Sequence, residues 1–493
     1  MFNMRLSRRQ QLSTVLVVLL LGGCGFGALP LRSKASNRSG ARRSVSAPAR
    51  PVRPVRRTTT TVRTTIPVAS TSSTTSTSST TSTLPRPSTR QVIWVSRSGN
   101  DSSNGTTRTD PVRTVTEAWS RIPQGIDIGT AYEISIEPGI YDEESLPTYW
   151  ESRHGTAAGP LEVSAAEGAG SVTFLAQMNV FDVRYLTVRN ITIAANGDAF
   201  HCERCLHVTL TAMVLDGGRR SAHDLLKVNQ SSYINIENSN IHGAEDNALD
   251  FVAVEHAVVR NNRIHDAGDW CAYAKGGSAD VLVEGNEIYN CGTGGFTAGQ
   301  GTGLEFMVSP HLTYEAEDVM VRNNSIHDTD GAGLGVNGGH NVTMTGNTLT
   351  RVGARSHTIE VGFGARGCDG NRSICSALVQ QGAWGTSSLD DGVNYVRIPN
   401  RSVLIEGNVI DNSTGSESAW QQLFVPGPWQ GSQAGSTNNP RPALADDGLV
   451  IRGNTFRNGG TAKPLGVGEP DSGCQVSNPT CNPAQLRRDN RFH

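Results

Sequence analysis

Aspartate and glutamate are absent from the first 90 positions, although the 493-residue chain contains 45 of them. The same positions hold 15 of the 43 lysines and arginines, so the remainder is acidic, with 28 basic residues against 45 acids. An acidic body repels polyanions, and we expect no nucleic-acid partner. Methionine is scarce and aromatic residues make up 6%, against 54 glycines, which disfavours a helical bundle. The length allows one large domain or two to three ordinary ones.

A long hydrophobic run is also missing at the N-terminus. The apolar residues 15–21 are too few to span a bilayer, which takes about 20 residues. Arginines precede this run and Leu-Gly-Gly-Cys24 follows it, which is the order of a secretory signal. The last four residues resemble the bacterial lipobox, whose cysteine becomes lipid-modified. We therefore predict a signal peptide over residues 1–24 and an exported protein, lipid-anchored through Cys24 to the outer face of the cell membrane.

Two alternatives stay open for this segment. It can be an ordinary signal peptide in which Cys24 is incidental. Residues 7–12 resemble a twin-arginine signal but lack the usual aromatic residue after the arginine pair, so the export route is undecided.

Residues 25–90 lack a core-forming pattern. Arginine, serine, threonine and proline fill this stretch, which cannot bury enough apolar surface to offset its ordering entropy. We predict a disordered linker. Its positive charge either lies against an anionic membrane surface or reflects only compositional bias.

One pattern recurs from residue 183 onward: two alternating apolar residues, a gap of two, asparagine, a gap of one, and a further apolar residue. The central slot holds these residues: Ile191, Met213, Ser239, Asn262, Asn286, Asn324, Asn347, Asn408 and Asn454. A period in the low twenties with alternation inside it predicts an all-β solenoid, a parallel β-helix with coils about 4.8 Å apart. Stacked asparagines can hydrogen-bond along such a solenoid, so we interpret them as structural.

The segment before the repeats predicts how the solenoid begins. Val115, Ala118, Trp119 and Ile122 share one face of a helix, which can cover the open core of a first coil. The strand and turn residues 92–106, Pro111 to Thr114, and Pro138-Gly-x-Tyr resemble the N-terminal segment of right-handed parallel β-helix proteins of the pectate-lyase superfamily. The resemblance covers about residues 91–460, and we place the β-helix domain at 91–465, followed by a C-terminal tail over 466–493. It implies this fold and leaves the activity open, because the scaffold hosts lyases, hydrolases, epimerases and non-enzymatic binders.

Eight cysteines remain after Cys24, an even number that suggests disulfides in an exported chain. Sequence neighbours give four plausible pairs: Cys202–Cys205, Cys271–Cys291, Cys368–Cys375 and Cys474–Cys481. Alternatives for the first pair are a redox dithiol or half of a metal site. The second pair is separated by nearly one coil, so its members can meet on adjacent coils.

Candidate functional residues follow from aligning the coils on the asparagine slot. The strand ahead of the slot then presents a row of outward residues: His201, Lys227, Asp250, Ala274 or Lys275, Glu305, Gly335 and Glu360. Lys275 joins the row if Ala272 and Ala274 point inward. The alternative is that the charges form only cross-strand salt bridges on a solvated sheet.

Asp246, Asn247 and Asp250 resemble the Asp-Asp-x-x-Asp calcium motif of one group of β-helix pectate lyases, with asparagine in place of the second aspartate. Asp224, about one coil earlier, approximates the further aspartate of that group. The resemblance implies a Ca²⁺ site formed by these four residues. It also implies a polyuronate lyase, in which the cation acidifies the proton α to the uronate carboxylate and Lys275 removes it.

Other features leave further options. Segments 292–318, 351–399 and 413–447 interrupt the repeats and carry aromatic residues, among them Tyr314 and Trp384, which either stack on sugars or anchor loops. The pairs His265–Asp266 and His327–Asp328 are interpreted as turn hydrogen bonds.

The sequence thus favours a monomeric, surface-anchored protein that acts on a polysaccharide. The enzymatic hypotheses are a calcium-assisted lyase, using Lys275 as base, and a hydrolase or epimerase, using Asp250 and Glu305. His201, Lys227, Glu360, Tyr314 and Trp384 would contact the glycan. The remaining hypothesis is a non-catalytic glycan-binding or structural protein.

Overall fold

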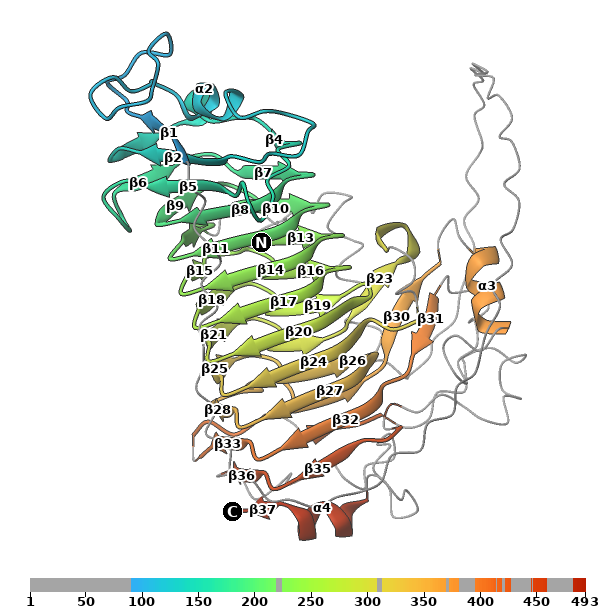
Figure 1. The fold of residues 1–493 in the computed structure, drawn as a ribbon. Helices are drawn as coiled ribbons and strands as arrows, with labels where there is room; N and C mark the ends of the chain where they lie inside the picture. The colour runs from blue at the N-terminus through green and yellow to red at the C-terminus, as the bar shows by residue number, and fades with distance from the viewer. Residues whose placement is uncertain are drawn as a thin grey trace, which may run out of the picture. The chain divides into compact units, whose positions relative to one another are not determined.

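The computed structural model describes residues 90–218, 224–307, 313–368, 372–380, 395–413, 415–418, 422–426, 445, 447–458 and 482–493. Ser82–His493 form one compact unit. In this unit, successive coils stack so that three long parallel sheets run along a common axis, as Figure 1 shows. Parallel crossovers of this kind are right-handed. The predicted parallel β-helix is therefore confirmed for the described residues.

Three parallel sheets form the walls of the solenoid. Sheet A contains β1 (Arg90–Val95), β2 (Ala131–Ile136), β5 (Leu161–Ala165), β8 (Arg184–Arg189), β11 (Leu206–Thr211), β14 (Ser232–Glu237), β17 (Glu255–Arg260), β20 (Ser278–Glu284), β24 (Ala316–Arg322), β27 (Gly339–Thr345), β32 (Arg401–Glu406) and β35 (Val450–Arg452). Sheet B contains β3 (Gly139–Tyr141), β6 (Val172–Phe174), β9 (Ile191–Ala194), β12 (Val214–Asp216), β15 (Asn240–His242), β18 (Arg263–Ala267), β21 (Glu287–Cys291), β25 (Ser325–Thr329), β28 (Thr348–Thr350), β33 (Val409–Asn412), β36 (Thr455–Asn458) and β37 (Arg491–Phe492). Sheet C contains β4 (Trp150–Glu151), β7 (Met178–Phe181), β10 (Phe200–Glu203), β13 (Leu226–Asn229), β16 (Leu249–Val252), β19 (Trp270–Lys275), β22 (Gly294–Ala298), β26 (Leu334–Asn337), β29 (Ile359–Gly362) and β34 (Leu423–Phe424).

The remaining elements are short. A small sheet D joins β23 (Gly301–Gly303), β30 (Gly364–Gly367) and β31 (Tyr395–Ile398). The helical elements are α2 (Val115–Ser120), η1 (Glu143–Ser145), η2 (Leu304–Phe306), α3 (Arg372–Gln380) and α4 (Pro483–Asp489). None of the helices in the described ranges is both long enough and apolar enough to cross a membrane.

Alternation along each strand places the apolar side chains inside the solenoid, as on β29, where Ile359 and Val361 are buried and Glu360 lies between them. The predicted asparagine ladder also lies inside. The Nδ2 atom of Asn286 donates to Oδ1 of Asn324 at 2.9 Å, and each following asparagine repeats this contact with the next coil. Asn490 ends the ladder by accepting from Asn454 at 2.9 Å. The ladder satisfies backbone groups at one turn of each coil and fixes the coil register.

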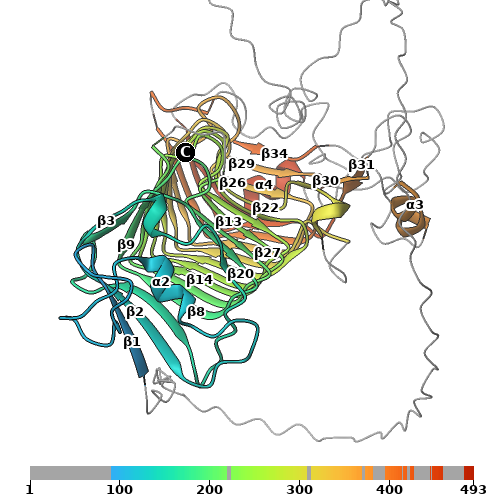
Figure 2. The same ribbon diagram turned by 90° about the horizontal axis from the view of Figure 1, so that it is seen from above.

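The first coil is covered as predicted. Helix α2 lies across the N-terminal end of the solenoid, which Figure 2 shows from above. Its residues Val115, Ala118 and Trp119 are buried against the core, as is Ile122, which follows the end of the helix. The ring of Trp119 contacts that of Trp150 on β4, with their centroids 4.9 Å apart. This contact fixes the helix against the core.

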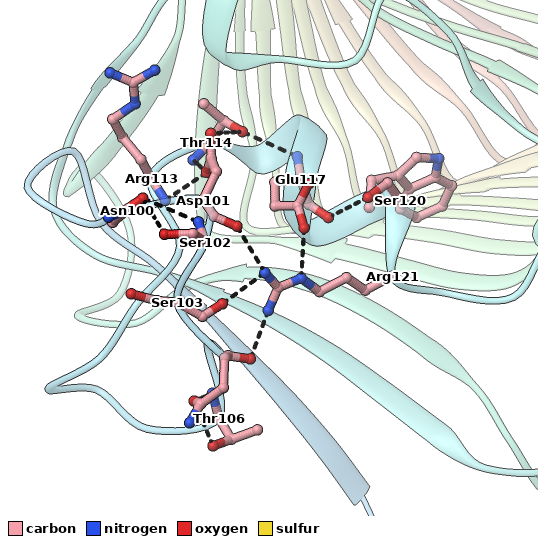
Figure 3. A network of polar contacts seen from close by, with 12 residues as sticks. Asn100, Asp101, Ser102, Ser103, Thr106, Arg113, Thr114, Glu117, Ser120 and Arg121 are labelled. Atoms are coloured by element: carbon pink, nitrogen blue, oxygen red, sulfur yellow. Dashed lines mark hydrogen bonds and ion pairs between the residues drawn. The ribbon is translucent and has the colours of Figure 1, made fainter.

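A polar network holds the segment before α2, as Figure 3 shows. Asp101 Oδ1 accepts hydrogen bonds from the backbone N–H groups of Arg113 and Thr114, both at 2.8 Å. Arg121 donates to the carbonyl oxygens of Asn104 and Ser103 at 2.6 and 2.8 Å. The polar residues of the 92–106 segment therefore have a structural function, because they satisfy the backbone of the first turn and the start of α2.

Three of the four predicted disulfides are present: Cys202–Cys205, Cys271–Cys291 and Cys368–Cys375. Cys474 and Cys481 lie outside the described residues, as do Cys24 and the rest of residues 1–89. The described part of the predicted C-terminal tail belongs to the solenoid, because β37 pairs with β36 and α4 precedes it.

Candidate functional site

The outward residues of sheet C form a continuous row across adjacent coils. Strand pairing aligns these residues: His201, Lys227, Asp250, Tyr273, Thr297, Gly335 and Glu360. Five of the predicted members are therefore in register. The fourth and fifth positions differ from the sequence-based expectation.

The fourth position belongs to Tyr273. Ala272 and Ala274 point into the core, so the outward residues of β19 are Tyr273 and Lys275. Tyr273 pairs with Asp250, whereas Lys275 pairs with Val252, two positions further along the strand. The prediction that Ala274 or Lys275 occupies the fourth position of the row is therefore wrong, because this strand pairing places Tyr273 there. The Nζ atom of Lys275 nevertheless lies close to the row, 4.2 Å from the ring centroid of Tyr273.

The fifth position belongs to Thr297 rather than Glu305. The predicted interrupting segment, 292–318, begins with β22, which continues sheet C, so Thr297 takes the row position and the extra residues come only after Ala298. Glu305 lies on η2 instead, and the prediction that it extends the row is wrong. The sixth position must remain a glycine, because a Cβ atom on Gly335 would lie 2.9 Å from Thr297 Oγ1 and 3.1 Å from the ring of Trp270.

The ammonium of Lys227 lies between two carboxylates from adjacent coils. Its Nζ is 2.5 Å from Asp224 Oδ2 and 3.2 Å from Asp250 Oδ2. Burial disfavours the charge of Asp224, but the nearby Lys227 outweighs it and lowers the pKa of that carboxyl. Asp250 is only 2% exposed, and burial raises its pKa to about 6 against the opposing effect of Lys275 and Lys227. Its Oδ1 atom has no hydrogen-bond partner among the described residues.

Asn247 joins this ion triad to Tyr273. Its Oδ1 accepts from the backbone N–H of Trp270 at 3.2 Å, which fixes the orientation of the amide. Its Nδ2 consequently faces Asp224 Oδ1 at 2.7 Å and the Tyr273 hydroxyl at 3.0 Å. The amide therefore presents a donor to the cluster, not an acceptor.

Lys275 has neutral hydrogen-bond partners. Its Nζ donates to the Tyr273 hydroxyl at 3.0 Å and to Gln300 Oε1 at 3.1 Å. Tyr273 is almost fully buried, and this burial together with the surrounding carboxylates raises the pKa of its hydroxyl well above the usual value. Tyr273 therefore keeps its proton at neutral pH, while its oxygen receives hydrogen bonds from Lys275 and Asn247.

Two further carboxylates lie at the partly exposed edge of this cluster. Burial raises the pKa of Asp246 to about 7, and repulsion by Asp224 and Asp269 adds to the shift. The pKa of Asp269 is raised in the same way, first by burial. Asp246 and Asp250 are thus the carboxyls of the cluster whose pKa values are raised toward neutral pH, and Asp246 is the more exposed of the two.

The four predicted calcium ligands do not fit a calcium ion as they are arranged. Asp224 and Asp250 already share the Lys227 ammonium, and Asn247 turns its NH₂ group toward Asp224. Within the described ranges, no group of three or more histidine, cysteine or acidic side chains is arranged to hold a metal ion. Calcium binding itself stays an untested prediction.

The predicted glycan-contacting residues are spread over the row and beyond it. His201 contacts Asn229 at 3.3 Å, and burial lowers its imidazole pKa. Glu360, at the other end of the row, accepts from Asn337 at 3.0 Å. Tyr314 is 6% exposed and its ring lies against His340, so the prediction that it presents a face to a sugar is wrong. Trp384 lies outside the described residues.

The interrupting segments place a small sheet beside the site. Strand β23 comes from the first segment, and β30 and β31 come from the second. Glu315 and Arg366, both fully buried, form an ion pair of 2.7 Å that joins the two interrupting segments. Glu315 Oε2 also accepts from Thr302 Oγ1 on β23 at 2.8 Å and from the backbone N–H of Gly276, next to Lys275, at 3.2 Å. Sheet D is thereby tied to the strand that carries Tyr273 and Lys275.

The two His–Asp pairs form turn hydrogen bonds, as interpreted from the sequence. His265 Nδ1 lies 2.8 Å from Asp266 and His327 Nδ1 lies 2.7 Å from Asp328. Their rings also stack on either side of Tyr289, with centroid distances of 4.4 and 4.8 Å. These rings stabilise sheet B and belong to no part of the site on sheet C.

Sequence reasoning missed Tyr273, Gln300 and Asp269. A signal for Tyr273 exists, because Asp250 follows Lys227 by 23 residues and Tyr273 follows Asp250 by another 23. Counting this step, rather than matching apolar neighbours, identifies the row member. Gln300 follows β22 in the inserted segment, where no repeat constrains its position.

Comparisons with known proteins agree with this architecture. The family described as "Right handed beta helix region" matches residues 199–368, which include the whole row from His201 to Glu360. A comparison with curated proteins gives no match.

Solved structures similar to this chain include the A-module of the Azotobacter vinelandii mannuronan C-5 epimerase AlgE6, with 14% identity over 74% of this chain and 91% of that one and a TM-score of 0.42. A rhamnogalacturonan lyase has 10% identity over 68% and 84%, with a TM-score of 0.44. The pectate lyase Pel9A has 14% identity over 75% of each chain, with a TM-score of 0.36. At these identities, the likeness concerns the fold.

Proposed function

We propose that this protein is a polysaccharide-active enzyme and that its site on β13, β16 and β19 cleaves an acidic glycan by β-elimination. The observation that carries the proposal is the environment of Lys275. Lys227 is neutralised by Asp224 and Asp250, whereas both hydrogen-bond acceptors of Lys275 are neutral oxygens. Lys275 is also partly exposed. Its ammonium is therefore the positive charge that a substrate carboxylate can bind.

The shape of the row supports a chain-like ligand. Its members follow one another at one residue per coil, and six steps from His201 to Glu360 extend over about 29 Å at about 4.8 Å per coil. This length accommodates several linked sugars. Asp250, Tyr273 and Thr297 in the middle of the row are buried. A bound chain would therefore contact the partly exposed Lys275 ammonium there, and the partly exposed ends of the row to either side.

The proposed reaction uses three side chains. Lys275 neutralises the uronate carboxylate, which acidifies the proton on the adjacent carbon. Asp246, ionised above its pKa of about 7, takes this proton. The electrons of the broken C–H bond form a carbon–carbon double bond as the bond to the 4-linked oxygen breaks. Tyr273, which keeps its proton at neutral pH, holds the Lys275 ammonium in place through its hydroxyl oxygen, and the departing oxygen takes its proton from solvent.

This proposal changes the role that the sequence suggested for Lys275. Lys275 donates to the Tyr273 hydroxyl and to Gln300 Oε1, and an ammonium, which has three N–H donors, keeps a further one for a substrate carboxylate. The ammonium form of Lys275 can both donate these two hydrogen bonds and bind a substrate carboxylate. Lys275 is therefore the carboxylate-binding group, and a carboxylate replaces it as the base.

The test is to incubate the full chain with acidic and neutral polysaccharides and follow both ultraviolet absorbance and new reducing ends. A lyase forms an unsaturated product that absorbs in the ultraviolet, and its rate rises with pH as Asp246 ionises. Lys275→Met and Asp246→Asn should each lower kcat by about 100-fold or more. Glu245→Gln, which changes the exposed neighbouring carboxylate, is the matched control and should keep full activity. Full activity in Lys275→Met would eliminate the proposal.

A second candidate is glycoside hydrolysis, favoured by the free Oδ1 of Asp250. Asp246, protonated below its pKa of about 7, would act as acid and Asp250 as base. Glu305, the partner expected from the sequence, is replaced by Asp246 in this version. The two reactions differ in product and in pH dependence, because hydrolysis yields reducing ends without ultraviolet absorbance and slows as Asp246 ionises. Binding without either product would indicate a non-catalytic glycan-binding protein.

A further inference from the structure

The centre of the cluster already contains a cation from the chain itself. Lys227 and Asp250 are direct neighbours on adjacent strands, and Asp224 precedes Lys227 by three residues. The ammonium thus contacts one carboxylate oxygen within its own coil and one from the next coil, at 2.5 and 3.2 Å. Both carboxylates are buried, which strengthens their attraction to the ammonium. A divalent cation bridging the same two oxygens would have to displace it.

The neighbouring groups reinforce this arrangement. Asn247 offers Nδ2 to the cluster because its Oδ1 is held by a backbone N–H, which can only donate. A calcium ion requires oxygen ligands and gains nothing from that NH₂ group. Lys275 adds a second positive charge on the following coil and interacts with Asp246 and Asp250. Two ammonium groups would therefore repel an incoming divalent cation, and the Asn247 amide would present its NH₂ group to it instead of an oxygen ligand.

We infer that Lys227 replaces a divalent cation at this position and that the protein does not bind calcium through Asp224 and Asp250 unless Lys227 is removed. The same oxygen atoms would then form a latent cation site, with Asp246 available as a further ligand. This inference is independent of the proposed reaction, because it concerns the binding of a metal ion and not turnover. It also separates this site from the calcium motif that the sequence resembles.

The test measures ion binding directly in the full chain after removal of metal by chelation. Calcium is titrated by calorimetry, and terbium is followed by its luminescence on excitation of tyrosine and tryptophan, because Tyr273 and Trp270 both contact Asn247. The wild-type protein should give no binding that depends on Asp250. Lys227→Met should gain a site and tighten calcium binding by about tenfold or more, because two acidic ligands lose their competing charge.

Matched variants test whether the gained calcium site depends on the loss of the Lys227 charge and on the Asp250 carboxylate. Lys227→Arg keeps the positive charge and should behave as the wild-type protein. Adding Asp250→Asn to Lys227→Met should abolish the gained site. Calcium binding by the wild-type chain that Asp250→Asn abolishes would overturn the inference, and this measurement does not require the Lys227 variant to fold. A Lys227→Met protein with wild-type circular dichroism and no gained site would overturn it as well.

Discussion

The buried ion pair between Glu315 and Arg366 allows a quantitative test of how sheet D is held. Neither side chain is exposed, and removal of one partner of a buried pair leaves an uncompensated charge. Burial lowers the pKa of Arg366 in spite of the nearby Glu315, so its charge is costly without that partner. Glu315→Gln keeps the shape and most hydrogen bonds but removes the anion. We expect it to lower the free energy of unfolding by about 3–5 kcal/mol.

The double variant Glu315→Gln with Arg366→Met distinguishes charge from packing. Replacing both members of a buried pair with neutral groups is often close to neutral, so the double variant should lose less stability than the sum of the two single variants. Glu287→Gln, which removes the anion of a pair that is about half exposed on each side, should cost less than about 1 kcal/mol. Denaturant unfolding followed by circular dichroism gives all four values. Additive effects of the two buried substitutions would refute the charge argument.

Three further predictions follow from other parts of the chain. Burial raises the pKa of Asp246 from 3.8 to about 7, so the folded state binds this proton more tightly than the unfolded state and stability falls as pH rises from about 4 to about 7. In pH-dependent thermal unfolding, Asp246→Asn should therefore gain stability relative to the wild type between about pH 4 and 7. A relative loss over that range would contradict the assignment. Asn324→Ala removes four ladder contacts and should cost about 2–4 kcal/mol in denaturant unfolding, against less than about 1 kcal/mol for Asn235→Ala on the outer face. Cys24→Ser should move the protein from the membrane fraction to the soluble exported fraction, whereas an unchanged distribution would exclude the predicted lipid anchor.

Periodicity made the solenoid and most of its outward row predictable. The coil repeat identifies the asparagine ladder because each coil repeats the same hydrogen-bonding requirement, and it identifies Lys227 and Asp250 because strand register follows the ladder. Tyr273 was missed because the sequence Ala-Tyr-Ala-Lys offers two outward residues, and only a repeat of the 23-residue step that separates Lys227 from Asp250 selects Tyr273.

The contacts that assemble sheet D follow no repeat. Strand β23 pairs with β30, more than 60 residues away, and the buried Glu315–Arg366 pair depends on that long-range pairing. The orientation of Asn247 depends on a backbone group of the next coil, and the fit of a calcium ion depends on that orientation. These features are tertiary, so a motif match cannot reveal them.

The distribution of lysine bears on how an acidic body could accept an acidic glycan. Arginine supplies nearly all the basic residues of the body, where the lysines are Lys227, Lys275 and Lys463. Two of these three lie in the cluster on sheet C. A lysine is a compact point charge that fits between two carboxylates, as Lys227 does, whereas the planar guanidinium of arginine prefers paired contacts with a single carboxylate. Lys227 offsets one of the two buried negative charges beside it, and Lys275 donates only to neutral oxygens, so the Lys275 charge stays available at the partly exposed edge of the cluster. The body can therefore be acidic as a whole and still offer one position along its row that attracts a carboxylate.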